Sequence, residues 1–235
     1  MVPGIRYGAG ATEVLNRIHI IGSGRVGSAV SARLVERGFA VGADAPELVL
    51  LCVPDGAIAE VAAAVEPGPW VAHVSGATPL AALAPHVRRF SVHPLQTFTR
   101  ERGAEQLDGA WAAVTAETED ARAAGMWLAE TLGLLPFALA DSARPLYHAG
   151  AVFASNYVVT LQRAASLLFE SAGAPPEALE PLMRRTIENG FELTGPIARG
   201  DWSTVEGHRA AIHEHRAELD ELYETLAGAT LALAT

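Results

Sequence analysis

Short apolar runs alternate with stretches of helical periodicity along the first 140 residues of the chain. The apolar runs predict strands at residues 17–21, 47–53, 70–74, 89–92, 111–115 and 136–139. Apolar positions at helical spacing predict helices between these strands, at residues 26–37, 57–65 and 118–132. Strands that alternate with helices are typical of a mostly parallel sheet that carries helices on its faces.

The pattern changes after Asp141, because the short apolar runs stop and only helical periodicity remains. This part of the chain predicts helices at residues 142–172, 181–193 and 203–226. We therefore expect two domains, an α/β domain over residues 1–141 and an all-helical domain over residues 142–235.

A glycine-rich turn, residues 22–27 with the sequence Gly-Ser-Gly-Arg-Val-Gly, lies directly between the first predicted strand and the first predicted helix. In dinucleotide-binding folds the first glycine permits the turn, the second lets a pyrophosphate approach the backbone, and the third lets the helix pack closely. The start of the helix adds free N–H groups that attract phosphate. We predict that this turn binds the cofactor through Gly22, Gly24, Arg25, Val26 and Gly27. The alternative is a glycine turn kept only for packing.

The interval behind this turn is too short for a complete dinucleotide-binding half. Nine residues separate Arg37 from Glu47, where a complete unit holds a second strand, a helix and a third strand. Residues 39–41 could form a remnant strand with Asp44 as a ribose ligand, but the five-residue link behind it spans at most about 18 Å. A direct connection into the strand at 47–53 is simpler. We expect a truncated Rossmann sheet whose second and third strands are reduced or absent, without the full second strand that would place Asp44 at a ribose.

The composition narrows the classes of function. A net charge of −10 argues against a nucleic-acid partner, and no apolar run approaches the roughly 18 residues that span a membrane. The one cysteine, Cys52, rules out an internal disulfide and is expected to be an inert core thiol. All 17 basic residues are arginine, which excludes a lysine Schiff base, a Walker-type loop and a lysine general acid. Residues 1–16 suggest a leader and not a signal peptide, so we expect a cytoplasmic protein.

Several motifs resemble a known family. Residues 22–27, 48–55 (Leu-Val-Leu-Leu-Cys-Val-Pro-Asp) and 93–98 (His-Pro-Leu-Gln-Thr-Phe) are similar to the Rossmann half of the predicted oxidoreductases that carry a DUF2520 domain. His148, residues 155–157, residues 193–201 and His208 resemble the DUF2520 half. The arrangement is more distantly similar to pyrroline-5-carboxylate reductase and the 6-phosphogluconate dehydrogenase-like group.

The resemblance implies an NADP or NAD cofactor, a small carbonyl or imine as substrate, and C-terminal helices that dimerise. It also implies that Val53 and Pro54 lie beside the nicotinamide ribose, with Ser75 following the next strand. The family keeps its second and third strands, so the short interval here departs from it. A non-catalytic binding or regulatory protein, or a binder of a smaller phosphate ligand, is therefore the alternative to a reductase.

Candidate catalytic residues lie in the helical half. His148, Ser155 and Asn156 recur at helical spacing on one face, which we interpret as facing the substrate. His148 would donate a proton, and Asn156 would orient a substrate oxygen. The alternative is an interdomain or dimer contact. Arg199 is a candidate clamp for a carboxylate or phosphate, unless Asp201 pairs with it and caps the last helix.

Other polar residues are weaker candidates. His93 and Gln96 follow a strand and are placed near the cofactor, while Asp55 is expected to cap the next helix. We expect no metal site, because His213 and His215 do not share a helix face. Long apolar stripes on the C-terminal helices predict a homodimer.

Overall fold

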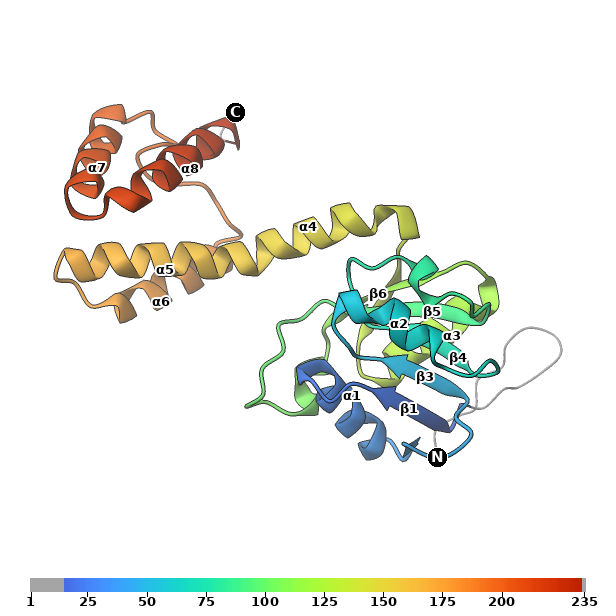
Figure 1. Cartoon of the computed structure of the whole chain (residues 1–235). Coiled ribbons are helices and arrows are strands. Elements are labelled where there is room, and N and C mark those ends of the chain that lie inside the picture. The colour runs from blue at the N-terminus through green and yellow to red at the C-terminus, as the bar shows by residue number, and fades with distance from the viewer. Residues whose placement is uncertain (1–14, 234–235) are drawn as a thin grey trace. The chain divides into compact units, whose positions relative to one another are not determined.

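The computed structural model describes residues 15–233, so most of the predicted leader lies outside the described residues (Figure 1). The chain divides into two compact units, the first ending at Val152 and the second beginning at Phe153. This boundary lies beyond the one expected after Asp141, because the first turns of the helix that follows pack against the sheet. Among residues 15–233, no helix has both the length and the apolar character needed to cross a membrane.

A seven-stranded sheet forms the centre of the first unit, with the strand order β2-β1-β3-β4-β5-β6-β7. Every neighbouring pair is parallel except β5 and β6. All six predicted strands form, which confirms the mostly parallel α/β sheet. The strands are β1 (Arg17–Ile21), β2 (Ala40–Val41), β3 (Leu48–Leu51), β4 (Trp70–His73), β5 (Arg89–Pro94), β6 (Trp111–Ala116) and β7 (Leu135–Ala138).

Helices cover both faces of this sheet. Successive residues of a strand point to opposite faces, so Leu48 and Leu50 join one apolar cluster while Val49 and Leu51 join the other. The first cluster includes α1 (Arg25–Glu36) and α3 (Glu119–Thr131), and the second includes α2 (Ile58–Ala63). Short 3-10 turns connect these elements at η1 (Asp55–Ala57), η2 (Leu80–Leu83), η3 (Ala104–Leu107) and η4 (Asp141–Ala143).

The remnant second strand is present, which corrects our preference for a direct connection. β2 has two residues and pairs with the start of β1, where Ala40 faces Arg17 and Val41 faces Ile18. β3 begins on the other side of β1, opposite the same Ile18. Only a full-length second strand would require a link that recrosses the whole sheet. Because β2 is so short, the link of residues 42–46 hardly has to recross the sheet. No third strand interrupts this link, so the sheet is truncated as predicted.

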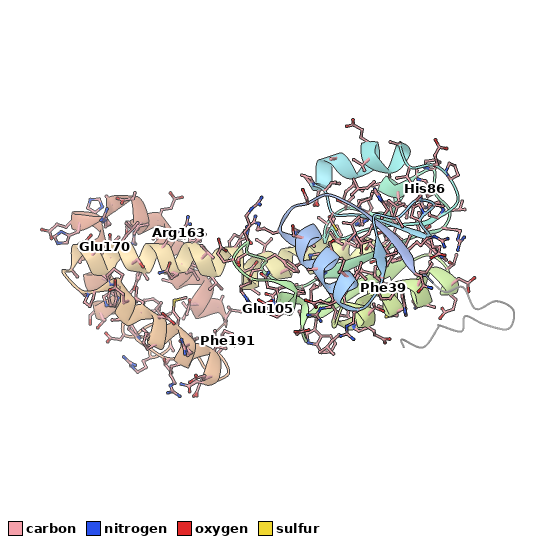
Figure 2. All side chains as sticks on the ribbon, turned by 90° about the horizontal axis from the view of Figure 1, so that it is seen from below. Phe39, His86, Glu105, Arg163, Glu170 and Phe191 are labelled. Carbon is pink, nitrogen blue, oxygen red and sulfur yellow. The ribbon has the colours of Figure 1, made fainter. Side chains whose placement is uncertain are left out.

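Side-chain contacts hold the shortened segment in place. Phe39, the residue before β2, is labelled in Figure 2. It is buried and packs edge-on against Trp127, with ring centroids 5.7 Å apart. At the end of the link, the Glu47 carboxylate accepts hydrogen bonds from the backbone N–H groups of Asn16 and Arg17 at 2.7 and 2.9 Å. The segment is therefore an ordered part of the fold.

The second unit contains helices and no strand among the residues that the structure describes. Its helices are α5 (Asn156–Ser171), η5 (Pro176–Ala178), α6 (Leu179–Glu188), α7 (Trp202–His215), η6 (Ala217–Leu219) and α8 (Asp220–Leu233). α5 packs with α6, and α7 packs with α8. The guanidinium of Arg209 on α7 bonds to Asp220 at 2.9 Å and to Glu224 at 2.9 Å, which joins the second pair.

Two predicted helices are each divided in the structure. The helix expected over 142–172 forms as α4 (Arg144–Ala154) and α5, and the chain departs from helical geometry at Ser155, where φ is −126° and ψ is −73°. The helix expected over 203–226 is interrupted at Arg216, where φ is −149°. Neither break carries a glycine or proline. The interruption at Arg216 allows α8 to fold back and form the Arg209 ion pairs.

Candidate functional site

Packing requires two of the three glycines in the turn between β1 and α1. Gly22 has a φ of +114°, and a Cβ there would lie 2.3 Å from the carbonyl oxygen of Cys52. A Cβ on Gly27 would lie 2.0 Å from the carbonyl oxygen of Gly22. Both contacts are shorter than any side chain tolerates, so the turn, the end of β3 and the first turn of α1 form one tightly packed unit.

Gly24 is exposed and, unlike Gly22 and Gly27, it is not closely packed. A Cβ built on Gly24 would meet no heavy atom within 4 Å, so the space beside this backbone is open. Gly24 is the N-cap of α1, and the first turn of α1 contains no acidic residue but includes the exposed Arg25. The first N–H groups of a helix have no acceptor within it. The open backbone, the helix start and the arginine together fit a diphosphate group.

The ends of β1, β3, β4 and β5 lie at one edge of the sheet, because these strands are parallel. We call this the carboxyl edge, and it carries the glycine turn, residues 53–55, residues 75–76 and His93. In open α/β sheets, ligands bind outside this edge. Asp55 begins η1 without capping it, so the expected helix cap is wrong.

Ser75 stabilises its own turn at this edge. Its hydroxyl accepts hydrogen bonds from the N–H groups of Ala77 and Thr78 at 3.2 and 3.0 Å, and it donates to the Thr78 hydroxyl at 2.9 Å. The side chain is buried. Ser75 thus shapes the loop that follows β4, and a cofactor contact by its hydroxyl stays a prediction.

A buried arginine connects α4 to β5, β6 and the loop after β4. The Arg144 side chain is 1% exposed, and its guanidinium donates to the hydroxyls of Ser91 at 2.7 Å and Thr115 at 2.9 Å and to the carbonyl oxygen of Ser75. The nearest carboxylate oxygen, on Asp141, lies 3.9 Å from Nε. Burial lowers the pKa of Arg144. These bonds fix the first turn of α4 against the end of β4.

Two imidazoles converge on Gly76 beyond this arginine, and Tyr147 contacts one of them. The ring nitrogen Nδ1 of His93 lies 2.7 Å from the hydroxyl of Tyr147, and the ring centroids of His93 and His148 are 6.2 Å apart. A Cβ on Gly76 would lie 2.8 Å from both His93 Cε1 and His148 Cδ2. Gly76 therefore allows two imidazoles to approach the loop after β4.

Burial keeps His93, Tyr147 and His73 in their uncharged forms near pH 7. It lowers the pKa of His93 to about 4, with a further decrease from the nearby His148 and Arg144. Burial likewise raises the pKa of Tyr147 to about 12. His73, at the end of β4, has its pKa lowered to about 3 by burial and by Arg144. His73 accepts a hydrogen bond on Nδ1 from the N–H of Ser75 at 3.2 Å.

The structure brings together only some of the predicted site residues. His148 and His93 meet in the first unit, whereas Ser155, Asn156 and Arg199 belong to the second. His148, Ser155 and Asn156 would share one face only on a continuous helix, and the helix is broken at Ser155. The Ser155 hydroxyl donates to Oδ1 of Asn156 at 3.0 Å.

Most of the remaining candidate site residues have structural roles. Asp201 caps α7, accepting from the N–H of Thr204 at 3.2 Å, while the Arg199 side chain is exposed. Gln96 donates to the carbonyl oxygen of Gln106 at 3.2 Å. Burial raises the pKa of Cys52 to about 12, so its thiol stays protonated. Among residues 15–233, no group of three His, Cys, Asp or Glu side chains could hold a metal ion.

Sequence reasoning missed Tyr147 and Arg144. Both lie within four residues of His148. The signal available in the sequence was an arginine within a largely apolar helix. The hydrogen-bond partners of the two residues, however, come from β5, β6 and the loop after β4, and no local pattern identifies such contacts.

Comparisons with known proteins show the family and the fold of the chain. Residues 110–230 match the family model described as a domain of unknown function, DUF2520. The structure resembles a candidate NADP oxidoreductase from Bacteroides fragilis, at 21% identity and a TM-score of 0.79 over 92% of this chain and 98% of that chain. At such identity the likeness shows a shared Rossmann-like fold. No curated protein matches the sequence.

Two further solved structures share this fold. A reductive aminase from Aspergillus terreus, in complex with NADPH and ethyl levulinate, has 17% identity and a TM-score of 0.66 over 92% of each chain. A 1-pyrroline-5-carboxylate reductase from Streptococcus pyogenes has 16% identity and a TM-score of 0.59 over 93% of this chain and 97% of that chain.

The low pKa values of His73 and His93 predict that mild acid destabilises the fold. The pKa of an unfolded histidine is about 6.5, so between pH 6.5 and about 4 the unfolded chain binds more protons than the folded chain. The free energy of unfolding therefore falls as the pH falls, by up to about 1.4 kcal/mol per pH unit for each histidine. Urea denaturation at pH 7, 6 and 5 measures this slope. In His73→Asn, whose amide oxygen can replace Nδ1 as acceptor, we expect a smaller slope. Equal stability at pH 7 and pH 5 would contradict the prediction.

Proposed function

The chain belongs to the DUF2520 family, and from this premise we propose that it is an NADP- or NAD-dependent oxidoreductase that acts on a small carbonyl or imine. One juxtaposition supports the proposal. The open turn at Gly24 and the group formed by His93, Tyr147 and His148 lie at the carboxyl edge of one sheet. An anion site next to proton-carrying side chains is the arrangement that hydride transfer with protonation needs.

Some residues at this edge bind the cofactor, and another transfers the proton. A bound nicotinamide supplies or accepts the hydride. Gly24 and Arg25 hold the diphosphate, and Val53 and Pro54 form the wall where β3 ends. Because the chain contains no lysine, the proton must be carried by another group, and we assign it to His148.

Tyr147 and His93 position this proton donor. The raised pKa of Tyr147 keeps its hydroxyl protonated, so the hydroxyl can donate to Nδ1 of His93. The single proton of neutral His93 then resides on Nε2, the nitrogen next to Gly76. The roles of Ser155, Asn156 and Arg199 stay predictions.

A second candidate function is supported by the truncated sheet. With β2 reduced to two residues, the scaffold could serve a non-catalytic binding or regulatory role. Measurable turnover of a nicotinamide cofactor with any carbonyl or imine would exclude this candidate.

We expect the protein to bind NADPH or NADH with a dissociation constant below about 1 mM, the upper range for enzyme substrates. Isothermal titration calorimetry measures it. Gly24→Ala should weaken binding about tenfold or more, because a methyl group would occupy the open space that the diphosphate needs. Gly207→Ala is the matched control, since a Cβ there also meets no atom within 4 Å. Failure of both cofactors to bind at millimolar concentration would refute the proposed function.

Substitution of the proton donor should reduce catalysis and spare binding. His148→Gln is expected to lower kcat by about 10²- to 10⁴-fold while the NADPH dissociation constant stays unchanged. Tyr147→Phe should have a smaller effect on kcat and should shift its pH profile, because the hydroxyl acts through His93. Steady-state kinetics with a panel of small imines and aldehydes tests this. Full activity of His148→Gln would show that another group donates the proton.

We also propose a homodimer formed through the helical unit. Only Leu179, Val205, Ile212 and Ala227 are buried within its described residues. Large apolar side chains are exposed along α5, α6 and the loop that follows, including Phe191 at 71% (Figure 2). Exposed apolar surface of this extent is typical of a protein interface, and a second copy provides a self-complementary partner.

Light scattering at micromolar concentration should give about twice the monomer mass of 24.6 kDa. Ile187→Glu on α6, at a side chain that is 61% exposed, should weaken the dimer about tenfold or more because the charge would be desolvated at the interface. Val87→Glu is the control, since Val87 is 88% exposed in the first unit. A monomeric mass for the unaltered protein would contradict the proposal.

A further inference from the structure

We infer that the site holds the nicotinamide and diphosphate part of its cofactor and makes no specific contact with the adenosine. The protein would then accept nicotinamide dinucleotides irrespective of the second base and of a 2′-phosphate. This inference rests on the proposed function, and it concerns how the same site selects its ligand.

The diphosphate position is intact, because its geometry depends on contacts that the truncation does not touch. Gly22 and Gly27 pack against each other and against Cys52 at the end of β3. None of these residues belongs to β2 or to the link that follows it. The backbone beside Gly24 stays open.

The adenosine position is not intact, because β2 ends too early. In a complete site an acid at the end of the second strand holds the ribose beside the diphosphate. Here β2 ends at Val41, which pairs with Ile18, and Gly22 lies four positions after Ile18. At about 3.3 Å per residue, the end of β2 stops roughly 13 Å short of the glycine turn.

The link behind β2 is fixed at the opposite end of β1. The N–H of Gly42 donates to the carbonyl oxygen of Ile18, and the N–H of Glu47 donates to that of Arg17, both at 2.9 Å. The Arg17 side chain donates from Nε to the carbonyl oxygen of Ala45 at 2.9 Å and pairs with Glu47 at 2.8 Å. In Figure 1 the chain between α1 and β3 lies near the tail of the β1 arrow, whereas the glycine turn follows its head.

These anchors keep Asp44 from the ribose. For Asp44 to reach the ribose, the chain would have to run from Gly42 straight toward the glycine turn. It would then have to return at once to Ala45, whose carbonyl oxygen accepts a hydrogen bond from Arg17. Residues 38–47 contain no arginine that could bind a 2′-phosphate. β2 is also the last strand on this side of the described sheet. Neither an acid, a base nor a further strand is therefore available for the adenosine.

Competition binding with intact dinucleotides tests the inference on the full-length protein. The probes are NADH, NADPH and reduced nicotinamide cytosine dinucleotide, which keeps the diphosphate but replaces the adenine. We expect all three dissociation constants to agree within about threefold, which is less than the tenfold step of one good contact. In saturation-transfer NMR, the nicotinamide protons of NADH should receive saturation and the adenine H2 and H8 protons should not.

Two variants sharpen the comparison. Gly24→Ala should weaken all three probes by the same factor, because each uses the diphosphate turn. Asp44→Ala should leave all three unchanged, whereas a ribose-binding carboxylate would make them weaker. A preference of tenfold or more for NADH or NADPH over the cytosine analogue, or saturation of the adenine protons, would overturn this inference and leave the proposed function intact. If no probe binds, the proposed function fails and the inference with it.

Discussion

The buried guanidinium of Arg144 is the interaction on which the candidate site depends. A charge without a carboxylate at hydrogen-bond distance is costly to bury, and the structure meets that cost with the Ser91 and Thr115 hydroxyls and the Ser75 carbonyl. These acceptors come from β5, β6 and the loop after β4. The first turn of α4 is thereby fixed to three parts of the sheet, and the next turn carries Tyr147 and His148.

The glycine turn depends on a separate set of contacts. Its shape follows from the approach of Gly22 to Cys52 and of Gly27 to Gly22, all within β1, α1 and the end of β3. The edge of the sheet beyond β1 contributes nothing to that packing. A chain can therefore lose most of its second strand and all of its third, and still present an open helix start to an anion.

Much of the fold could be predicted from the sequence because buried parallel strands read as continuous apolar runs. The run at Leu48–Leu51 is one example. The breaks at Ser155 and Arg216 could not be predicted, since neither position carries a glycine or a proline, the residues that break a helix most strongly. The remnant strand at Ala40 was undervalued because the reach of the link was judged against a full-length strand. In the site, His148 was identified by its residue type, whereas Tyr147 matters through a bond to His93, 54 residues away.

The charge state of this group constrains which residue can deliver a proton. Burial, together with the nearby His148 and Arg144, holds His93 in its neutral form near pH 7, and burial also keeps the Tyr147 hydroxyl protonated. A neutral imidazole is a poor acid, so His93 cannot replace the absent lysine by itself. It can accept the Tyr147 proton in a hydrogen bond and direct its own N–H toward Gly76. The remaining imidazole at that position is His148, next to the same glycine. Neutral His93 therefore orients the group, and His148 is the imidazole that we propose as the acid.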